Sequence, residues 1–384
     1  MRTAHKIGLA SVALIMALLV FWFRPGQLED RFYSSSSPAY VPMPADEFND
    51  YVQENRSRVR AALAEFYYSR ETWPFGTAYP LESVVNMRSP YELQPDPVVC
   101  AETDRHSGFL MVHGLSDSPY LLRPVAESLA AQYPCALIRG LLTPGHATIP
   151  GDLKKADRAV WLETLVWAVN GFAAEVDQLY MVGYSNGAAL ALQYLDQHRE
   201  QDFVEALILL SPGLEVRDPL IHLAPYFGLV RPWISRHGDQ DAVKYESFPT
   251  KAAAQFYRLT QQITSEDFRS LLIPTLMVIS GNDTTVNAST SLAFFCDRIA
   301  GRRHALWYGS AAANSLPPQN CAGLEVVDIS GQDPRFVSHS HVAVTMPRSD
   351  SHYGENGNYV NCLAYLAGSD ERRRCQSEPD DTVY

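Results

Sequence analysis

The sequence lacks the features that would connect it with nucleic acid or with a bound metal. Its 31 Lys and Arg residues are outnumbered by 43 Asp and Glu residues, for a formal net charge of −12. The densest basic run, Arg372–Arg374, is short and lies near the C-terminus, so it offers no surface for a row of phosphates. The chain also has no CxxC pair and no Cys/His cluster with metal-ligand spacing. Nucleic-acid binding is therefore excluded, and neither a metal nor an organic cofactor is expected.

Charge is also missing from Ile7–Phe23, an apolar segment close to the N-terminus. As a helix, its 17 residues would rise about 25 Å, slightly less than the apolar thickness of a bilayer. Arg2 and Lys6 precede it, which favours a cytoplasmic N-terminus over residues 1–6 and export of the chain beyond the segment. The segment ends in bulky residues, whereas a cleavage site needs small ones. We therefore expect a transmembrane anchor over residues 7–23 and a periplasmic or extracellular main domain. Secretion after signal cleavage is the alternative.

The six cysteines are an even number, which in an exported chain permits three disulfides. Nearness in the sequence suggests the pairs Cys362–Cys375 and Cys296–Cys321, which leaves Cys100–Cys135. Reduced, buried thiols are the alternative interpretation.

The chain divides into an N-terminal part and one large domain. Residues 24–43 are rich in proline and serine and are typical of a linker. Ala45–Tyr68 carries apolar residues at helical spacing, which predicts an accessory helix that packs on the main domain. Linker and helix together occupy residues 24–80, and the main domain occupies residues 81–384.

From residue 108 onward, strand-like and helix-like segments alternate, which predicts an α/β fold with a mostly parallel, doubly wound sheet. Short continuous apolar runs suit strands that are buried on both faces. The alternation lapses between Pro212 and Phe268, in a stretch with several prolines and apolar residues, and we expect a helical lid insertion at about residues 213–268. The strand candidates are Phe109–His113, Ala136–Arg139, Leu179–Gly183, Ala206–Leu210, Thr275–Ile279 and Leu324–Asp328.

Residues 183–187 read G-x-S-x-G, after the apolar run Leu179–Val182 and before helix-like sequence. A strand that turns sharply into a helix at a serine is a nucleophile elbow, and its glycines leave room for a tight, strained turn. The pentapeptide alone is a weak signal, because a chain of this length contains it by chance about one time in ten. Its flanking elements make Ser185 the predicted nucleophile.

Acyl transfer at a serine also needs a base and an acid that orients the base. The acid is expected downstream of the serine at the C-terminal end of a strand, and Asp283 stands at such a position. His339 and His341 both follow the last strand candidate, and the residues alone do not separate them. His304 stands at the wrong end of its strand. His352 lies in a loop rich in Ser, Asp and Gly, where we expect it to be solvated.

Donors for the oxyanion are expected from the backbone, in the residue after the nucleophile and in the loop after the first strand candidate. These are the amides of Asn186 and Leu115. Residues 116–119 read as a helix cap with proline in the first turn, so Asp117 and Ser118 are predicted to be structural.

Five segments of the chain occur together in one known order: HGLSDSP (113–119), LTPGHATIP (142–150), GYSNG (183–187), SGNDTTV (280–286) and SHVAV (340–344). With these segments the chain resembles the α/β-hydrolases of the monoacylglycerol-lipase and carboxylesterase type, over roughly residues 100–365. The resemblance implies the doubly wound hydrolase fold and ester hydrolysis. In such enzymes the histidine begins a His-x-x-aliphatic stretch, which points to His341. The separation of Asp283 from His341 is longer than usual, and we expect the extra residues between Arg303 and Ala322.

Together these features predict a serine hydrolase that cleaves carboxylic esters through an acyl-enzyme, with Ser185 as nucleophile, His341 as base and Asp283 as its orienting acid. The apolar insertion and the N-terminal segment favour a small-molecule substrate with a lipid-like or medium-chain acyl group. The same three residues could serve an amidase, an aminopeptidase or a thioesterase, because the pocket chooses the leaving group. A non-catalytic binding module with a hydrolase fold is the alternative from another class.

Overall fold

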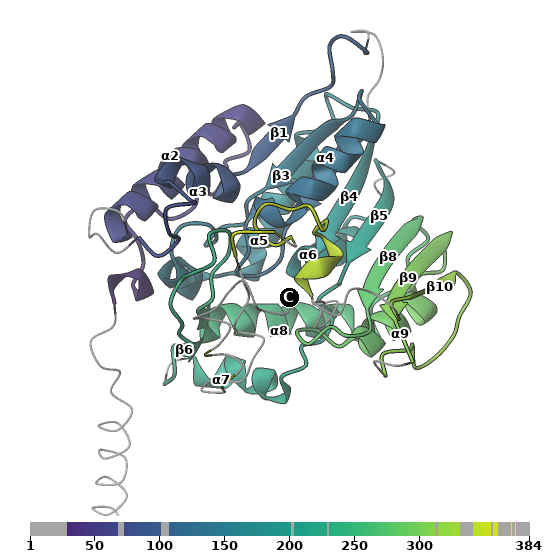
Figure 1. Ribbon diagram of the computed structural model, residues 1–384. Coiled ribbons are helices and arrows are strands. Elements are labelled where there is room, and N and C mark those ends of the chain that lie inside the picture. The colour runs from purple at the N-terminus through teal and green to yellow at the C-terminus, as the bar shows by residue number, and fades with distance from the viewer. Residues whose placement is uncertain are drawn as a thin grey trace, which may run out of the picture.

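A large mixed sheet forms the centre of the protein (Figure 1). Its eight strands lie in the order β1-β3-β2-β4-β5-β8-β9-β10, and every neighbouring pair from β3 to β10 is parallel. The edge strand β1 runs antiparallel to β3. The predicted mostly parallel sheet is therefore confirmed. The computed structural model describes residues 29–67, 73–100, 107–200, 203–228, 230–311, 314–330, 341–354, 356–359, 370 and 373.

Strands and helices alternate along the chain. The strands of the large sheet are β1 (Tyr91–Leu93), β2 (Ser107–Val112), β3 (Leu137–Leu141), β4 (Gln178–Tyr184), β5 (Val204–Leu210), β8 (Thr275–Ser280), β9 (Arg303–Gly309) and β10 (Leu324–Asp328). A separate pair consists of β6 (Trp233–Ser235) and β7 (Phe248–Pro249). The α-helices are α2 (Phe48–Phe66), α3 (Leu81–Arg88), α4 (Arg123–Gln132), α5 (Arg158–Asn170), α6 (Asn186–Gln197), α7 (Ala224–Phe227), α8 (Thr250–Ile263) and α9 (Ala288–Arg298). Short 3₁₀ helices are η1 (Asp30–Phe32), η3 (Pro119–Leu122), η4 (Pro150–Lys155), η5 (Pro219–Leu223) and η6 (Val342–Val344).

The order of the strands reverses direction at β2. The chain moves from β2 to β3 on one side of β2, then returns to β4 on the other side and continues outward from there. Because crossovers between parallel strands are right-handed, α4 and α6 cover opposite faces of the sheet, as the doubly wound arrangement requires. The reversal lies between β2 and β4, and in such sheets the carboxyl ends of the strands at this point are the usual position of a ligand site.

All six predicted strands are present, as β2, β3, β4, β5, β8 and β10. Four strands were missed: β1 and β9 in the large sheet, and the separate pair β6 and β7. β1 has only three residues, and β9 begins with Arg303 and His304 and alternates between buried and half-buried positions. The stretch from Arg303 to Ala322, expected to hold the extra residues, is therefore a strand in its first third and a loop after that.

The helix predicted over Ala45–Tyr68 is α2, and it packs against α3 and β1 at the upper left of Figure 1. Tyr51, Val59 and Leu63 on one face of this helix are fully buried in the main hydrophobic core. The Tyr51 hydroxyl donates to the Leu142 carbonyl at 2.5 Å and accepts from the Leu142 N–H at 3.1 Å. This exchange joins α2 to the loop after β3.

Between β5 and β8 the chain leaves the sheet for η5, α7, β6, β7 and α8. This is the insertion expected from the lapse in alternation. Its longest helix, α8, packs against α6 and η4, with α7 and β6 below it in Figure 1. The smaller α7 leaves Tyr226 and Phe227 exposed.

Two of the three suggested disulfides are present. Cys100 bonds Cys135 across 35 residues, and Cys296 bonds Cys321 across 25 residues. The alternative of reduced thiols is therefore wrong for these four cysteines, while Cys362–Cys375 lies outside the described residues.

The predicted membrane segment, Ile7–Phe23, also lies outside the described residues. Among the helices in the part of the chain that the structure covers, none has both the length and the apolar character needed to cross a membrane. The linker from residue 29 onward lies against the main domain. Arg31 forms a buried ion pair with Asp239 at 2.5 Å, and the Ser35 hydroxyl donates to Asp152 at 2.6 Å.

We expect the substitution Tyr51→Phe to lower the free energy of unfolding by about 2 kcal/mol, because it leaves the buried Leu142 amide groups without a partner. Urea denaturation followed by circular dichroism measures this. The control is Tyr226→Phe, which removes a hydroxyl from an 80% exposed side chain and should change stability by less than about 0.5 kcal/mol. Equal stabilities of the two variants would contradict the anchoring role of Tyr51.

Candidate active site

A strained turn joins β4 to α6 at Ser185. The strand ends at Tyr184, the helix begins at Asn186, and Ser185 between them has φ 53° and ψ −115°. A positive φ is costly for a residue with a side chain and is maintained only where the surrounding structure enforces it. The Ser185 side chain lies at the carboxyl end of β4 and retains 7% of its exposure.

The two glycines of the motif are required by close packing around this turn. A Cβ on Gly183 would lie 2.5 Å from the Ala188 Cα, and a Cβ on Gly187 would overlap the Val112 carbonyl oxygen. The first turn of α6 therefore lies directly against the end of β2, and only glycine permits this approach. The sequence motif is thus a packing requirement as well as a chemical one.

Asp283 and His341 form a buried pair. His341 Nδ1 lies 2.6 Å from Asp283 Oδ2, and the other carboxylate oxygen accepts from the N–H groups of Thr285 at 2.8 Å and Val286 at 2.9 Å. These bonds fix the carboxylate, so that the His341 Nδ1–H is the donor and Nε2 is left for another partner. Asp283 is 1% exposed and His341 is 8% exposed.

The His341 ring lies beside the elbow, with its centroid 5.0 Å from that of the Tyr184 ring. The structure thus brings all three predicted residues to the same edge of the sheet. Among the described residues, Ser185 Oγ and His341 Nε2 form no hydrogen bond with each other or with other groups. Nucleophile–base contacts are often long before substrate binds, so this does not argue against their pairing.

The predicted oxyanion donors lie on both sides of Ser185. Asn186 is the first residue of α6, and its N–H is therefore one of the amides that a helix leaves unbonded at its N-terminus. Leu115 follows Gly114, where a Cβ would lie 3.1 Å from the Ser185 Cβ. Neither the Leu115 N–H nor the Asn186 N–H donates to another residue that the structure describes. Both remain free for a ligand atom.

His113 holds the Leu115 loop in place, a role that the sequence analysis missed. Its Nε2 accepts from the Thr143 N–H at 3.1 Å, so Nδ1 carries the proton and donates to the Gly114 carbonyl at 2.7 Å. Burial lowers the pKa of His113 to about 4, and the ring is neutral at neutral pH. The signal that could have located it is its position directly after β2.

The prediction that Asp117 and Ser118 cap a helix is wrong in its chemistry. Ser118 does precede η3 and Pro119 does begin it, but neither side chain bonds the helix N–H groups. The Asp117 carboxyl is buried beside the Leu115 loop, and burial raises its pKa to about 6.

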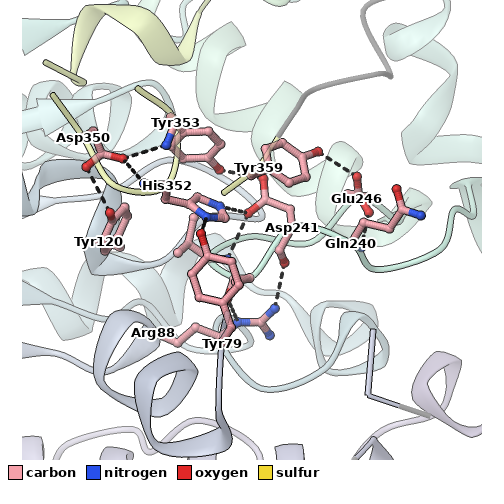
Figure 2. A network of polar contacts seen from close by, with 12 residues as sticks. Tyr79, Arg88, Tyr120, Gln240, Asp241, Glu246, Asp350, His352, Tyr353 and Tyr359 are labelled. Atoms are coloured by element: carbon pink, nitrogen blue, oxygen red, sulfur yellow. Dashed lines mark hydrogen bonds and ion pairs between the residues drawn. The ribbon is translucent and has the colours of Figure 1, made fainter. Parts of the chain in front are cut away.

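His352 is fully buried, which corrects the expectation that it is solvated. Figure 2 shows its ring between Tyr79 and Asp241. Nδ1 contacts the Tyr79 hydroxyl at 2.5 Å, and Nε2 lies 2.9 Å from Asp241 Oδ1. The second oxygen of Asp241 accepts from the Tyr353 hydroxyl at 2.6 Å.

This polar network fastens the segment that follows His341 to the insertion. Asp350 caps its own turn by accepting from the N–H groups of His352 and Tyr353, and it also accepts from the Tyr120 hydroxyl of η3 at 3.0 Å (Figure 2). Burial opposes the ionisation of Asp241, but the hydrogen bond and charge of His352 outweigh it, and the pKa of Asp241 is lowered. The position of His341 therefore depends on contacts far from the catalytic edge.

The sheet order, the strained serine elbow and the Asp–His pair together match the arrangement of the α/β-hydrolase fold. A family model described as alpha/beta hydrolase fold matches residues 109–237. A thermostable monoacylglycerol lipase of Bacillus sp. (strain H-257) is 25% identical over 188 residues, which cover 47% of this chain and 71% of that enzyme.

Solved structures of lipolytic enzymes are also similar. One comes from the metagenome-derived lipolytic enzymes LipS and LipT, with a TM-score of 0.48 and 18% identity over 57% of this chain and 86% of that chain. Another is the monoacylglycerol lipase of Paleococcus ferrophilus, with a TM-score of 0.45 and 14% identity over 57% of this chain and 87% of that chain. The family model and the Bacillus lipase confirm the resemblance drawn from the sequence, and carboxylic ester hydrolase, the predicted class of enzyme, is also the class of that lipase.

We expect Gly187→Ala to destabilise the protein by at least about 2 kcal/mol, because the new methyl group overlaps the Val112 carbonyl and must displace α6 from β2. Chemical denaturation measures the change. Gly238→Ala is the matched control, since a Cβ there meets nothing within 4 Å, and it should change stability by less than about 0.5 kcal/mol. A Gly187→Ala variant as stable as the wild type would refute the packing argument.

A second prediction concerns acid stability. Because Asp241 has a lower pKa in the folded protein than in the unfolded chain, its ionised form stabilises the fold above about pH 4. That contribution disappears as the pH falls below this value. Asp241→Asn should lower stability by about 3 kcal/mol at pH 7 and reduce the further loss of stability as the pH falls below about 4. Unfolding free energies measured across this range test it, with the exposed Asp267→Asn as control; equal slopes in wild type and Asp241→Asn would disprove it.

Proposed function

We propose that the protein is a serine hydrolase that cleaves carboxylic esters through an acyl-enzyme. The observation that carries the proposal is the buried His341–Asp283 pair, 2.6 Å apart, at the same sheet edge as the strained Ser185. A side chain held at a positive φ beside two unbonded backbone amides is placed for attack on a carbonyl group.

In the proposed mechanism, His341 Nε2 takes the proton of Ser185 Oγ as the oxygen attacks the ester carbonyl carbon. Asp283 accepts the Nδ1–H bond, holds the imidazole tautomer and stabilises the imidazolium. The amides of Leu115 and Asn186 donate to the oxyanion. Collapse of the tetrahedral intermediate breaks the ester C–O bond, and His341 returns the proton to the leaving alcohol. A water molecule activated by the same histidine then hydrolyses the acyl-enzyme and releases the acid.

We propose residues 213–268 as a lid over this site. The insertion begins at the nucleophile, since the Gly213 N–H donates to the Ser185 carbonyl at 3.0 Å. The insertion also contacts the Leu115 loop, where the Tyr245 N–H donates to the Ser116 carbonyl at 2.8 Å. Both contacts support a cover that adjoins the reacting groups.

The substrate that we propose carries a lipid-like or medium-chain acyl group. The insertion exposes Leu220, Tyr226 and Phe227, and large apolar side chains grouped on one surface segment are typical of contact with apolar ligands or membranes. The name of the Bacillus relative, a monoacylglycerol lipase, agrees with an acyl ester of this kind.

We further propose that residues 7–23 anchor the protein in the membrane, with the catalytic domain on the periplasmic or extracellular side. The charge-free segment after Arg2 and Lys6 supports the anchor. The disulfides Cys100–Cys135 and Cys296–Cys321 support an oxidising compartment. Secretion of a cleaved form is the alternative.

Labelling with a fluorophosphonate probe tests the nucleophile. We expect wild-type protein to be labelled and to hydrolyse p-nitrophenyl esters, while Ser185→Ala is neither labelled nor active above about 10⁻⁵ of the wild-type rate. Well-folded wild-type protein that takes no label would favour a binding module. A labelled protein that cleaves amides or thioesters in preference to esters would favour the related hydrolases.

The base is tested by a pair of histidine variants. His341→Ala should lower kcat by about 10⁵-fold, because Ser185 then has no proton acceptor, whereas His339→Ala should lower it less than about threefold. Steady-state kinetics with p-nitrophenyl butanoate compares them. The reverse order would transfer the role of base to His339, which lies outside the described residues.

A further inference from the structure

One carboxylate beside the proposed nucleophile receives no hydrogen bond from the part of the chain that the structure describes. Asp117 is 6% exposed, yet among the described residues no N–H or O–H group donates to either of its oxygens. Other buried carboxylates of this protein are bonded: Asp152 accepts from Ser35 and Thr148, and Asp283 accepts from two backbone amides. A buried carboxylate without a donor is costly, so its position calls for an explanation.

The carboxylate lies close to Ser185. A Cβ built on Gly114 would overlap Asp117 Oδ2 on one side and would lie 3.1 Å from the Ser185 Cβ on another. The same point is 3.2 Å from the Tyr184 ring. Asp117 Oδ2 and the Ser185 side chain therefore both lie close to Gly114.

Five ionisable groups face Asp117. Burial raises its pKa to about 6, while the charges of Lys244 and His341 lower it and that of Asp241 raises it. Tyr184 and Tyr353 complete the set, and their pKa values are raised by burial first and by the charge of Asp117 as well. Lys244 forms no ion pair with another described residue. Asp117 is therefore mainly ionised at neutral pH and is a strong acceptor.

We propose that Asp117 is a specificity-determining residue, whose carboxylate accepts a hydrogen bond from a hydroxyl or ammonium group of the substrate near the scissile ester. The proposal rests on the proposed function, because it assumes that an ester reacts at Ser185. It narrows the substrate class to acyl esters that carry a donor close to the reacting carbonyl.

The charge of Asp117 has opposite effects on two kinds of ester. For an ester without a donor, the carboxylate repels the oxyanion that develops nearby and slows the reaction. For an ester with a donor, the hydrogen bond satisfies the buried carboxylate and compensates for that repulsion. Sites built to bond a polar substrate group discriminate strongly against analogues that lack it.

The test compares kcat/KM for esters of one acid: 2-hydroxyethyl butanoate, 2-(dimethylamino)ethyl butanoate and propyl butanoate. Asp117→Asn should lower the ratio of each donor ester to the propyl ester by about tenfold or more, and should raise the rate for the propyl ester. Comparison of the 2-hydroxyethyl ester with the 2-(dimethylamino)ethyl ester shows whether Asp117 accepts from a hydroxyl or from an ammonium group. Ethyl 3-hydroxybutanoate against ethyl butanoate tests a donor on the acyl side. Ratios that stay within about twofold in all arms would overturn the proposal.

Asp152→Asn is the matched control, because it also neutralises a buried aspartate with a raised pKa, but one that is fully bonded and outside the site. It should leave the ratios unaltered whatever it does to stability. If Asp117→Asn does not fold, the pH dependence of the wild-type protein tests the proposal instead. The ratio of 2-hydroxyethyl to propyl ester should rise as the pH rises through about 6, since Asp117 ionises there, and effects of pH on the shared reaction at the ester bond cancel in the ratio. A flat ratio from pH 5 to pH 8 refutes the role.

Failure of this inference differs from failure of the proposed function. If Ser185 is no nucleophile, no ester in the set is cleaved and the fluorophosphonate probe does not react. If only the inference is wrong, all of the esters are cleaved without selectivity for a donor.

Discussion

The close packing of α6 against β2 is the constraint on which the rest of the site depends. The Val112 carbonyl lies where a side chain at residue 187 would stand, and two residues earlier the backbone at Ser185 has a positive φ. The Asn186 amide at the start of the helix donates to no described residue. This tight turn thus holds both the proposed nucleophile and a proposed donor for the oxyanion, at the cost of a local conformation that the surrounding core must maintain.

The remaining parts of the site come from chain segments far apart in the sequence, which the sheet order brings together. Ser185 follows β4, Asp283 follows β8 and His341 precedes η6. Within the described residues 341–354, η6 is the only helix or strand, so the position of this segment depends on the contacts of His352, Tyr353 and Asp350 with the insertion and with η3. Stability of the buried network and geometry of the site are therefore coupled, as expected when a functional loop is fixed by hydrogen bonds and not by a strand.

The sequence predicted those features that arise from local patterns. Continuous apolar runs located the central strands, and G-x-S-x-G located the elbow because its glycines answer a steric demand within a few residues. β9 was missed because it begins with the polar residues Arg303 and His304. Only two apolar residues then precede its aromatic pair, Trp307 and Tyr308. His352 was misjudged for a different reason: its loop is polar in composition, but its partner Asp241 lies 111 residues away. A contact between residues so far apart in the sequence cannot be predicted from a local pattern.

Two buried aspartates lie near His341, and their carboxyl groups differ in the hydrogen bonds that they receive. Asp283 receives two backbone N–H bonds and the His341 Nδ1 contact, which favour its charged form as the partner of an imidazolium. Asp117 receives none from the described residues, and burial raises its pKa to about 6. Carboxyl groups whose environments differ in this way take different roles in one site. A bonded aspartate suits the orientation of a base, whereas an unbonded one has capacity left for a donor that the protein itself does not supply. In our proposal, the polarity of the substrate near its reacting bond thus depends on the aspartate that receives no hydrogen bond from the described residues.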